Sequence, residues 1–149
     1  MDNNCTTNGR AQQLYPATIR IRDLRLRTYI GFNPEEREKK QDVIINIEIR
    51  YNMSAAVLDD RVEEALNYKV ISKNVISHVE QGKFLLLEKL VGDVLHICSD
   101  HPDILFASVT IEKPHALRFA DSVSLTLEHT PEISHPRQGQ SLTLMEKAS

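Results

Sequence analysis

One stretch of this chain restricts its fold more than any other. Between residues 43 and 51 every second residue is apolar, and Asn46, Glu48 and Arg50 occupy the reverse face. A period of two is typical of a β-strand with one buried face and one exposed face. The sequence therefore predicts a half-buried strand here, in a sheet that packs one face against a core.

A second strand is expected before it, over residues 17–30. Ile19 and Ile21 alternate with arginines, and then Leu24 and Leu26 alternate with arginines in the opposite phase. The one-residue slip near Asp23 predicts a β-bulge. Residues 17–30 and 42–52 are expected to pair antiparallel, and residues 31–37 between them to form an exposed, charged loop.

Two helices and two more strands are expected after this pair. Apolar residues recur at helical spacing from Tyr68 to Val79, with Gly82 at the C-cap position, and again from Leu87 to Cys98. Residues 105–111 and 123–127 return to alternation. The sequence predicts an α+β fold of order ββααββ, with two helices on one face of a four-stranded antiparallel sheet.

The opposite face and the edges of this sheet have no cover in a single copy. The outward positions are mostly polar, and edge strands leave backbone groups unpaired. Edge-to-edge pairing of copies into a ring would cover these edges, which predicts a homo-oligomer. We expect a single domain over 17–129, with flexible tails over 1–16 and 130–149, because neither end has an apolar period.

The charge balance and composition exclude several classes of partner. A net charge of -3 provides no general basic field for nucleic acid or anionic lipid, so a small ligand is expected. The six histidines and two cysteines lack metal-ligand spacing, and the five glycines never cluster, so neither a metal site nor a glycine-rich phosphate loop is predicted. No apolar stretch approaches the roughly 20 residues that span a membrane. Cys5 and Cys98 lie in unlike surroundings, which disfavours a disulfide and favours a reducing, cytoplasmic location.

A few polar residues occupy positions where chemistry is possible. Glu88 lies at the start of the second helix, on the margin of its apolar stripe. It is either a first-turn glutamate that the helix dipole stabilises or a carboxylate that accepts two N–H bonds from a guanidine-like heterocycle. Lys113, before Pro114, is either a solvated turn residue or a partly desolvated proton carrier. Glu36 can be a solvated loop residue and Tyr68 a core aromatic. Taken one at a time, each structural interpretation is favoured over its functional alternative.

These features occur together in one order along the chain. That order resembles the signature of the dihydroneopterin aldolases and their epimerase relatives, from about residue 19 to 128. The strings over 24–31 and 113–124 look closer to the epimerase branch than to typical aldolases. The residues that carry the resemblance are Gly31, Glu36, Gln41, Asn67-Tyr68, Leu86-Leu87-Glu88-Lys89-Leu90 and Glu112-Lys113-Pro114.

The resemblance implies the tunnelling fold, in which the sheets of four subunits close a barrel and two such rings stack into an octamer. It implies a pterin site between neighbouring subunits, with no metal and no other cofactor. The catalytic residues implied are Lys113, Tyr68 and Glu36. The substrate-binding residues implied are Glu88, Leu87, Asn67 and Tyr68, with His115, Arg118, Lys113 and Arg27 as candidate cations for phosphate groups.

The reaction implied is an epimerisation at C2' that converts 7,8-dihydroneopterin triphosphate to 7,8-dihydromonapterin triphosphate. It would proceed by retro-aldol cleavage and aldol closure, with the dihydropterin ring as electron sink. Two alternatives stay open. One is an aldolase that releases 6-hydroxymethyl-7,8-dihydropterin and glycolaldehyde in folate biosynthesis, and the other is a pterin-binding oligomer without turnover.

Overall fold

The computed structural model describes residues 14–131. Two long strands come first, β1 (Leu14–Ile30) and β2 (Gln41–Ser54), with the short helix α2 (Pro34–Glu38) between them. Two short 3-10 helices, η1 (Ala55–Asp59) and η2 (Val62–Glu64), lead into α3 (Tyr68–Gln81). The chain then forms β3 (Lys83–Phe84), α4 (Leu87–Ser99), β4 (Ile104–Pro114) and β5 (Ser122–His129).

Strands β1 and β2 form the expected antiparallel pair, from Leu14 opposite Ser54 to Thr28 opposite Gln41. The register shifts between Ile21 and Leu24, so the predicted bulge is confirmed. Asp23 adopts a φ of 53° there, and its backbone N–H donates to Asn46 Oδ1 at 3.0 Å. A bulge leaves its extra residue out of the strand pairing, and aspartate is among the non-glycine residues that adopt the left-handed region most often.

The sheet has five strands in the order β3-β1-β2-β4-β5, and not the four that the sequence predicted. The extra strand is the two-residue β3, which pairs parallel with Tyr29 and Ile30 at the end of β1. All other neighbours are antiparallel. The expected antiparallel arrangement therefore holds for the four long strands, and β3 adds a parallel edge.

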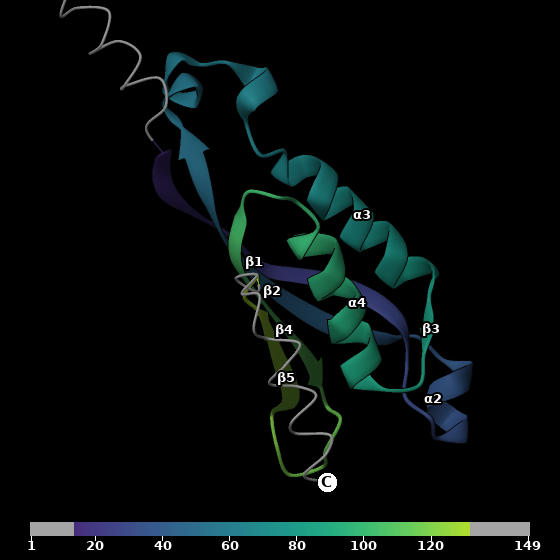
Figure 1. Ribbon diagram of the computed structural model, residues 1–149. Helices are drawn as coiled ribbons and strands as arrows, with labels where there is room; N and C mark the ends of the chain where they lie inside the picture. The colour runs from purple at the N-terminus through teal and green to yellow at the C-terminus, as the bar shows by residue number, and fades with distance from the viewer. Residues whose placement is uncertain (1–13, 132–149) are drawn as a thin grey trace, which may run out of the picture.

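Both long helices lie on one face of the sheet, as predicted (Figure 1). Helix α3 packs against β1, and α4 packs against β4 and β5. The core lies between these helices and the inward-facing residues of the strands, and its largest fully buried side chains include Ile45, Ile49, Leu90 and Ile111. Burial of each such side chain contributes about 1.5–3 kcal/mol. The buried thiol of Cys98 belongs to this core, and burial raises its pKa to about 12.

The other face of the sheet is polar and charged. Arg20 Nε lies 2.9 Å from Glu48 Oε1, and Arg50 Nη2 lies 2.9 Å from Glu48 Oε2. A hydroxyl contact of 2.6 Å between Thr110 and Thr126 continues the polar surface across β4 and β5. The predicted alternation of polar and apolar residues thus separates the two faces of the sheet.

The segment 31–37 is not only a loop, because Pro34–Glu38 forms the helix α2. Pro34 stands at its first turn, where a fixed φ and a missing N–H are tolerated, and Glu35 and Glu36 follow in the same turn. Strand β1 begins at Leu14, three residues before the expected start of the domain. Apart from residues 14–16, 130 and 131, the two expected tails lie outside the described residues.

Candidate functional site

The Glu36 carboxylate and the Lys113 ammonium lie in direct contact. Lys113 Nζ donates to Glu36 Oε2 at 2.9 Å, which joins α2 to the end of β4 across 77 positions of sequence. The exposed fractions of the two side chains are 13% for Lys113 and 24% for Glu36. Two of the three predicted catalytic residues therefore form a partly buried ion pair, and Lys113 is not the solvated turn residue that one of its two readings required.

The surroundings of Glu36 hold its carboxylate in place. Gln41 Nε2 donates to Glu36 Oε2 at 3.3 Å and also to the carbonyl of Ile30. Gly31 has a φ of 129°, and a Cβ at this position would overlap the Glu36 carboxylate. Glycine is required here for both backbone conformation and close approach.

The pKa of Glu36 lies below its ordinary value. The hydrogen bond from Lys113 lowers this pKa most, partial burial opposes the shift, and the hydrogen bond from Gln41 adds to it. A depressed pKa keeps the carboxylate ionised at neutral pH. Glu36 can therefore act as a fixed negative charge that orients the Lys113 ammonium.

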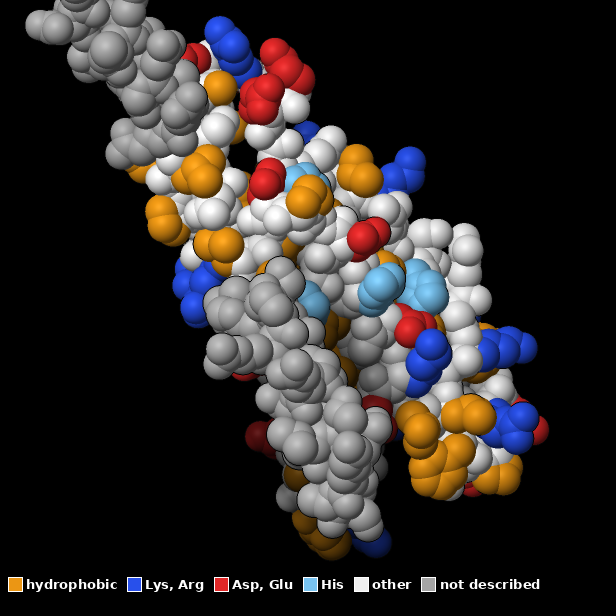
Figure 2. Space-filling view, in the orientation of Figure 1, with side chains coloured by type: hydrophobic (Ala, Val, Ile, Leu, Met, Phe, Trp, Pro, Cys, Tyr) orange, Lys and Arg blue, Asp and Glu red, His pale blue; other side chains and the backbone are white. Residues whose placement is uncertain are grey.

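Leu87 and Glu88 lie in the first turn of α4, at the same end of the molecule. The backbone N–H of Gly31 donates to the carbonyl of Phe84 at 2.9 Å, which joins β1 to the segment that leads into α4. The Glu88 side chain is exposed, so a single chain does not bury it in the apolar pocket that one reading of the sequence required. Exposed hydrophobic side chains gather at this end (Figure 2), among them Phe32, Leu85 and Leu86.

Asn67 and Tyr68 lie at the N-terminal end of α3, away from the Glu36–Lys113 pair. The Asn67 side chain caps the helix by accepting the N–H of Val70 at 3.2 Å. Helix α3 has 14 residues and is therefore roughly 20 Å long, which separates Tyr68 from the Glu36 end. The Tyr68 side chain is 50% exposed, so its interpretation as a core aromatic is wrong.

Tyr68 borders an apolar groove of about 830 Å³. The groove lies between the first half of α3, the segment before it, and strands β1 and β2, and its apolar lining includes Ile19, Tyr51, Met53, Leu66 and Ile76. Apolar concave surfaces of this size are typical of ligand sites or of contacts with another chain. Within one chain the groove does not reach Lys113.

His115 and Arg118 lie in the turn that joins β4 to β5. Both side chains are exposed, and His115 has a φ of 64°. The Arg118 guanidinium lies 5.5 Å from the ring centroid of Phe119, whose side chain is 94% exposed. The structure thus places two of the predicted phosphate-binding residues close behind Lys113 in the chain, on an open turn.

A model of the dihydroneopterin aldolase family matches residues 19–128. The chain is 50% identical over 111 residues to the dihydroneopterin triphosphate 2'-epimerases of Escherichia coli and Pseudomonas aeruginosa. These matches cover 74% of this chain and 92% and 90% of the two enzymes.

The chain belongs to the dihydroneopterin aldolase family. A crystal structure of E. coli dihydroneopterin aldolase in complex with neopterin superposes with a TM-score of 0.70 at 26% identity. That match covers 76% of this chain and 98% of the aldolase. The fold is therefore the tunnelling fold that the resemblance implied, and identity to the epimerases is about twice the identity to this aldolase.

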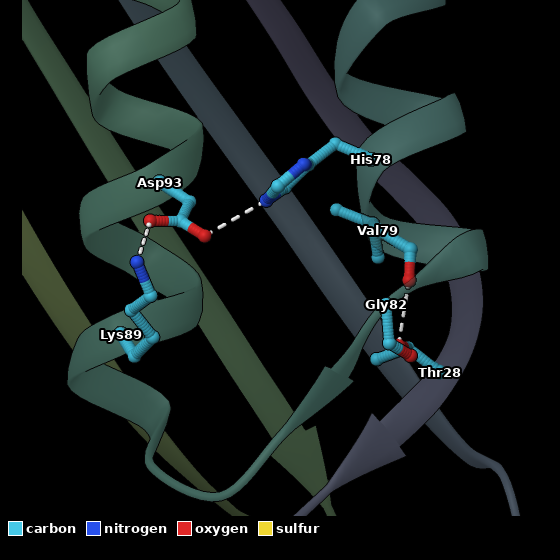
Figure 3. A network of polar contacts seen from close by, with 6 residues as sticks. All are labelled: Thr28, His78, Val79, Gly82, Lys89 and Asp93. Carbon is cyan, nitrogen blue, oxygen red and sulfur yellow. Dashed lines mark hydrogen bonds and ion pairs between the residues drawn. The ribbon is translucent and has the colours of Figure 1, made fainter.

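The sequence analysis did not predict a polar network that joins α3 to α4 (Figure 3). Asp93 Oδ2 lies 2.8 Å from His78 Nε2, and Asp93 Oδ1 accepts from Lys89 Nζ at 2.8 Å. In the same view, the buried Thr28 hydroxyl donates to the carbonyl of Val79 at 2.6 Å. The spacing of Lys89 and Asp93, four residues apart in one helix, was a usable signal.

Within residues 14–131, no three His, Cys, Asp or Glu side chains are grouped to hold a metal ion. No described helix is long and apolar enough to cross a membrane.

Proposed function

We propose that the chain epimerises C2' of 7,8-dihydroneopterin triphosphate to give 7,8-dihydromonapterin triphosphate. The observation that carries this proposal is the 50% identity to two dihydroneopterin triphosphate 2'-epimerases over nearly their whole length. The ion pair of Glu36 and Lys113 supports it, because acid-base chemistry needs a positioned proton carrier.

The proposed reaction begins with removal of the proton from the C2' hydroxyl. The C1'–C2' bond then breaks, its electron pair enters the dihydropterin ring, and C2' becomes the aldehyde carbon of a phosphorylated glycolaldehyde. If this aldehyde stays bound and rotates, C1' attacks the opposite face of its carbonyl group and the new alkoxide is reprotonated. Lys113 and Tyr68 are the proposed proton carriers, and Glu36 orients Lys113.

We propose that Glu88 anchors the pterin. An ionised carboxylate can accept two N–H bonds from the 2-amino and N3 edge of the ring, and such paired charged hydrogen bonds are among the strongest. Leu87 would pack beside the ring in the same first turn of α4. The exposure of Glu88 in a single chain fits a site that another copy covers.

The separation of Tyr68 from Lys113 supports a site shared between copies. Asn67 and Tyr68 of one copy would complete the Lys113 end of its neighbour. We therefore propose that the chain assembles through its sheet edges into tetrameric rings, two of which stack as a homo-octamer. A cytoplasmic location stays a prediction.

The test is to incubate purified protein separately with dihydroneopterin triphosphate and with free dihydroneopterin, and to identify the pterins by chromatography. We expect the monapterin epimer of the triphosphate as the main product, with a small leak of 6-hydroxymethyl-7,8-dihydropterin. If the hydroxymethyl pterin is the main product from either compound, the chain is an aldolase. Tight pterin binding with no turnover would instead identify a binding oligomer.

Turnover in D2O tests the bond that breaks. In the retro-aldol route the C2' hydrogen stays on its carbon as the aldehyde hydrogen, so the epimer should carry no deuterium at C2'. Stoichiometric deuterium at C2' by mass spectrometry would exclude this route and make direct removal of the C2' hydrogen the mechanism.

A further inference from the structure

A small hollow on the polar face of the sheet adjoins the end of β4, immediately after Lys113. It has a volume of about 310 Å³. Residues of three strand ends line it, and those that bear on its chemistry are Arg25, Arg27, Asp42, Ile44, Pro114 and His115.

The bulge at Asp23 determines which arginines reach this hollow. Before the bulge, Arg20 and Arg22 occupy the polar face, and after it the odd-numbered Arg25 and Arg27 do so. Side chains two residues apart on a strand point to the same face. Two guanidinium groups therefore border one hollow at the end of the sheet where Lys113 lies.

The two arginines differ in what holds them. Arg27 Nε lies 3.2 Å from Asp42 Oδ1, and Arg27 Nη2 donates to the carbonyl of Lys40 at 3.0 Å. Arg25 is exposed and makes no ion pair with any residue between 14 and 131. The charge of Arg27 is thus partly compensated by Asp42, whereas the charge of Arg25 is available to a ligand.

We infer that this hollow receives the triphosphate of the substrate, and that Arg25 determines the preference for phosphorylated over free dihydroneopterin. The inference rests on the proposed function. A guanidinium fork matches the spacing of phosphate oxygens and can bind them in a bidentate manner. Arg27 and the imidazole of His115 provide further donors on the same hollow.

The position of Lys113 fits this assignment. Lys113 and Pro114 are consecutive on β4, so their side chains leave opposite faces of the strand. A substrate whose C2' lies at Lys113 directs its ester around the end of β4, and three linked phosphoryl groups supply the reach. Free dihydroneopterin, which lacks this ester, ends before the hollow and has no contact with Arg25.

A second hollow on the same face provides the control. It is lined by Arg20, Arg22 and Glu48, among others, and lies nearer the start of β4, beside Ser108 and Thr110. Arg20 is paired with Glu48 there, whereas Arg22, like Arg25, is exposed and forms no ion pair among the described residues. Arg22→Gln therefore removes a matched charge at the wrong distance from Lys113.

The first experiment compares Arg25→Gln with Arg22→Gln in the assembled protein. For Arg25→Gln we expect KM for dihydroneopterin triphosphate to rise roughly tenfold or more, with KM for free dihydroneopterin unchanged, because only the ester loses a charged partner. Arg22→Gln should leave both values within about twofold. Arg25→Lys should recover part of the loss, since it keeps the charge without the fork.

The second experiment needs no turnover. Inorganic tripolyphosphate is titrated calorimetrically at low salt into the wild-type, Arg25→Gln and Arg22→Gln proteins, and only Arg25→Gln should lose binding. If the wild type epimerises the triphosphate and Arg25→Gln has an unchanged substrate preference, the inference is wrong and the proposed function stands. If the wild type turns over neither pterin but binds tripolyphosphate through Arg25, the anion site stands and the proposed function is wrong.

Discussion

The two ends of helix α3 differ in how much of a site one chain completes. At its C-terminal end, Gln41 and Lys113 both donate to the Glu36 carboxylate, and Gly31 provides the space for that carboxylate. At its N-terminal end, Tyr68 is half exposed beside an apolar groove of about 830 Å³. The first end is organised within one chain, whereas the second presents an open apolar surface. Under the proposed function, chemistry that uses both ends therefore requires two copies.

The contrast between the two ends of α3 predicts that Tyr68 and Lys113 of one site come from different copies. We expect Lys113→Gln and Tyr68→Phe each to lower kcat by about 10²–10⁴. Co-expression of the two variants should restore about a quarter of wild-type activity, because sites with both native residues form where unlike copies meet.

The control for this experiment mixes the two variants after each has been assembled separately, under conditions without subunit exchange. This mixture should stay inactive. Failure of the co-expressed sample to recover activity, despite proven mixed oligomers, would place both residues of the site in one chain.

Glu88 sharpens the comparison, since it lies at the organised end and is nevertheless exposed. We expect Glu88→Gln to weaken neopterin binding by roughly 100-fold, because the amide presents donors to the donors of the ring. Its effect on stability should be small. Calorimetric titration against Glu80→Gln, an exposed helical glutamate on α3, provides the control, and equal affinities would reject the anchor role.

The organised end depends on the space that Gly31 leaves for the Glu36 carboxylate. Gly31→Ala combines a positive φ with overlap on Glu36, so we expect the free energy of unfolding to fall by about 1–3 kcal/mol. At Gly92, inside α4, a Cβ meets only Leu127 Cδ1 at 4.0 Å, and Gly92→Ala should raise stability by about 0.5–1 kcal/mol. Urea unfolding of both variants measures the contrast, and equal losses would mean that the two positions do not differ.

The smallest expected effect is the pH dependence of the Glu36–Lys113 pair. The folded pKa of Glu36 lies below the ordinary value of 4.5, so the pair stabilises the fold fully above that value and loses this contribution as pH falls through the folded pKa. Wild type should exceed Lys113→Gln by about 1 kcal/mol or less at neutral pH, with the difference vanishing in acid. Unfolding curves between pH 7 and 3 test this, and a difference that persists in acid contradicts it.

The sequence predicted the elements whose pattern extends over many residues. The alternation in β1 and β2 was long enough to show both the strands and the phase slip at Asp23, and the apolar stripe of α4 gave its bounds to within a residue. Strand β3 has two residues and α2 has five, so neither could show a period. Their positions depend on tertiary contacts, such as the pairing of Lys83 with Tyr29.

The candidate site was predictable only as a set of residue types. Glu36 and Lys113 were identified together through the resemblance, and the geometry of their contact follows from strand register, which neither residue reveals alone. Local pattern placed Tyr68 on the same apolar stripe as Val75 and Val79, but the stripe is buried only from its middle onward. Whether the first turn of a helix is covered depends on the segments that pack beside it, and the sequence of the helix alone does not contain that information.

The bulge at Asp23 changes which side chains of β1 face the core. Upstream of it the odd-numbered side chains enter the core, and downstream the even-numbered ones do. Deletion of this single residue, with the downstream pairing kept, would turn Ile19 and Ile21 toward solvent and bring arginines against the helices. The chain therefore tolerates exchange of residues along this strand far better than a change in their number, because only the extra residue at the bulge lets Ile19 and Ile21 face the core while Arg25 and Arg27 face the hollow.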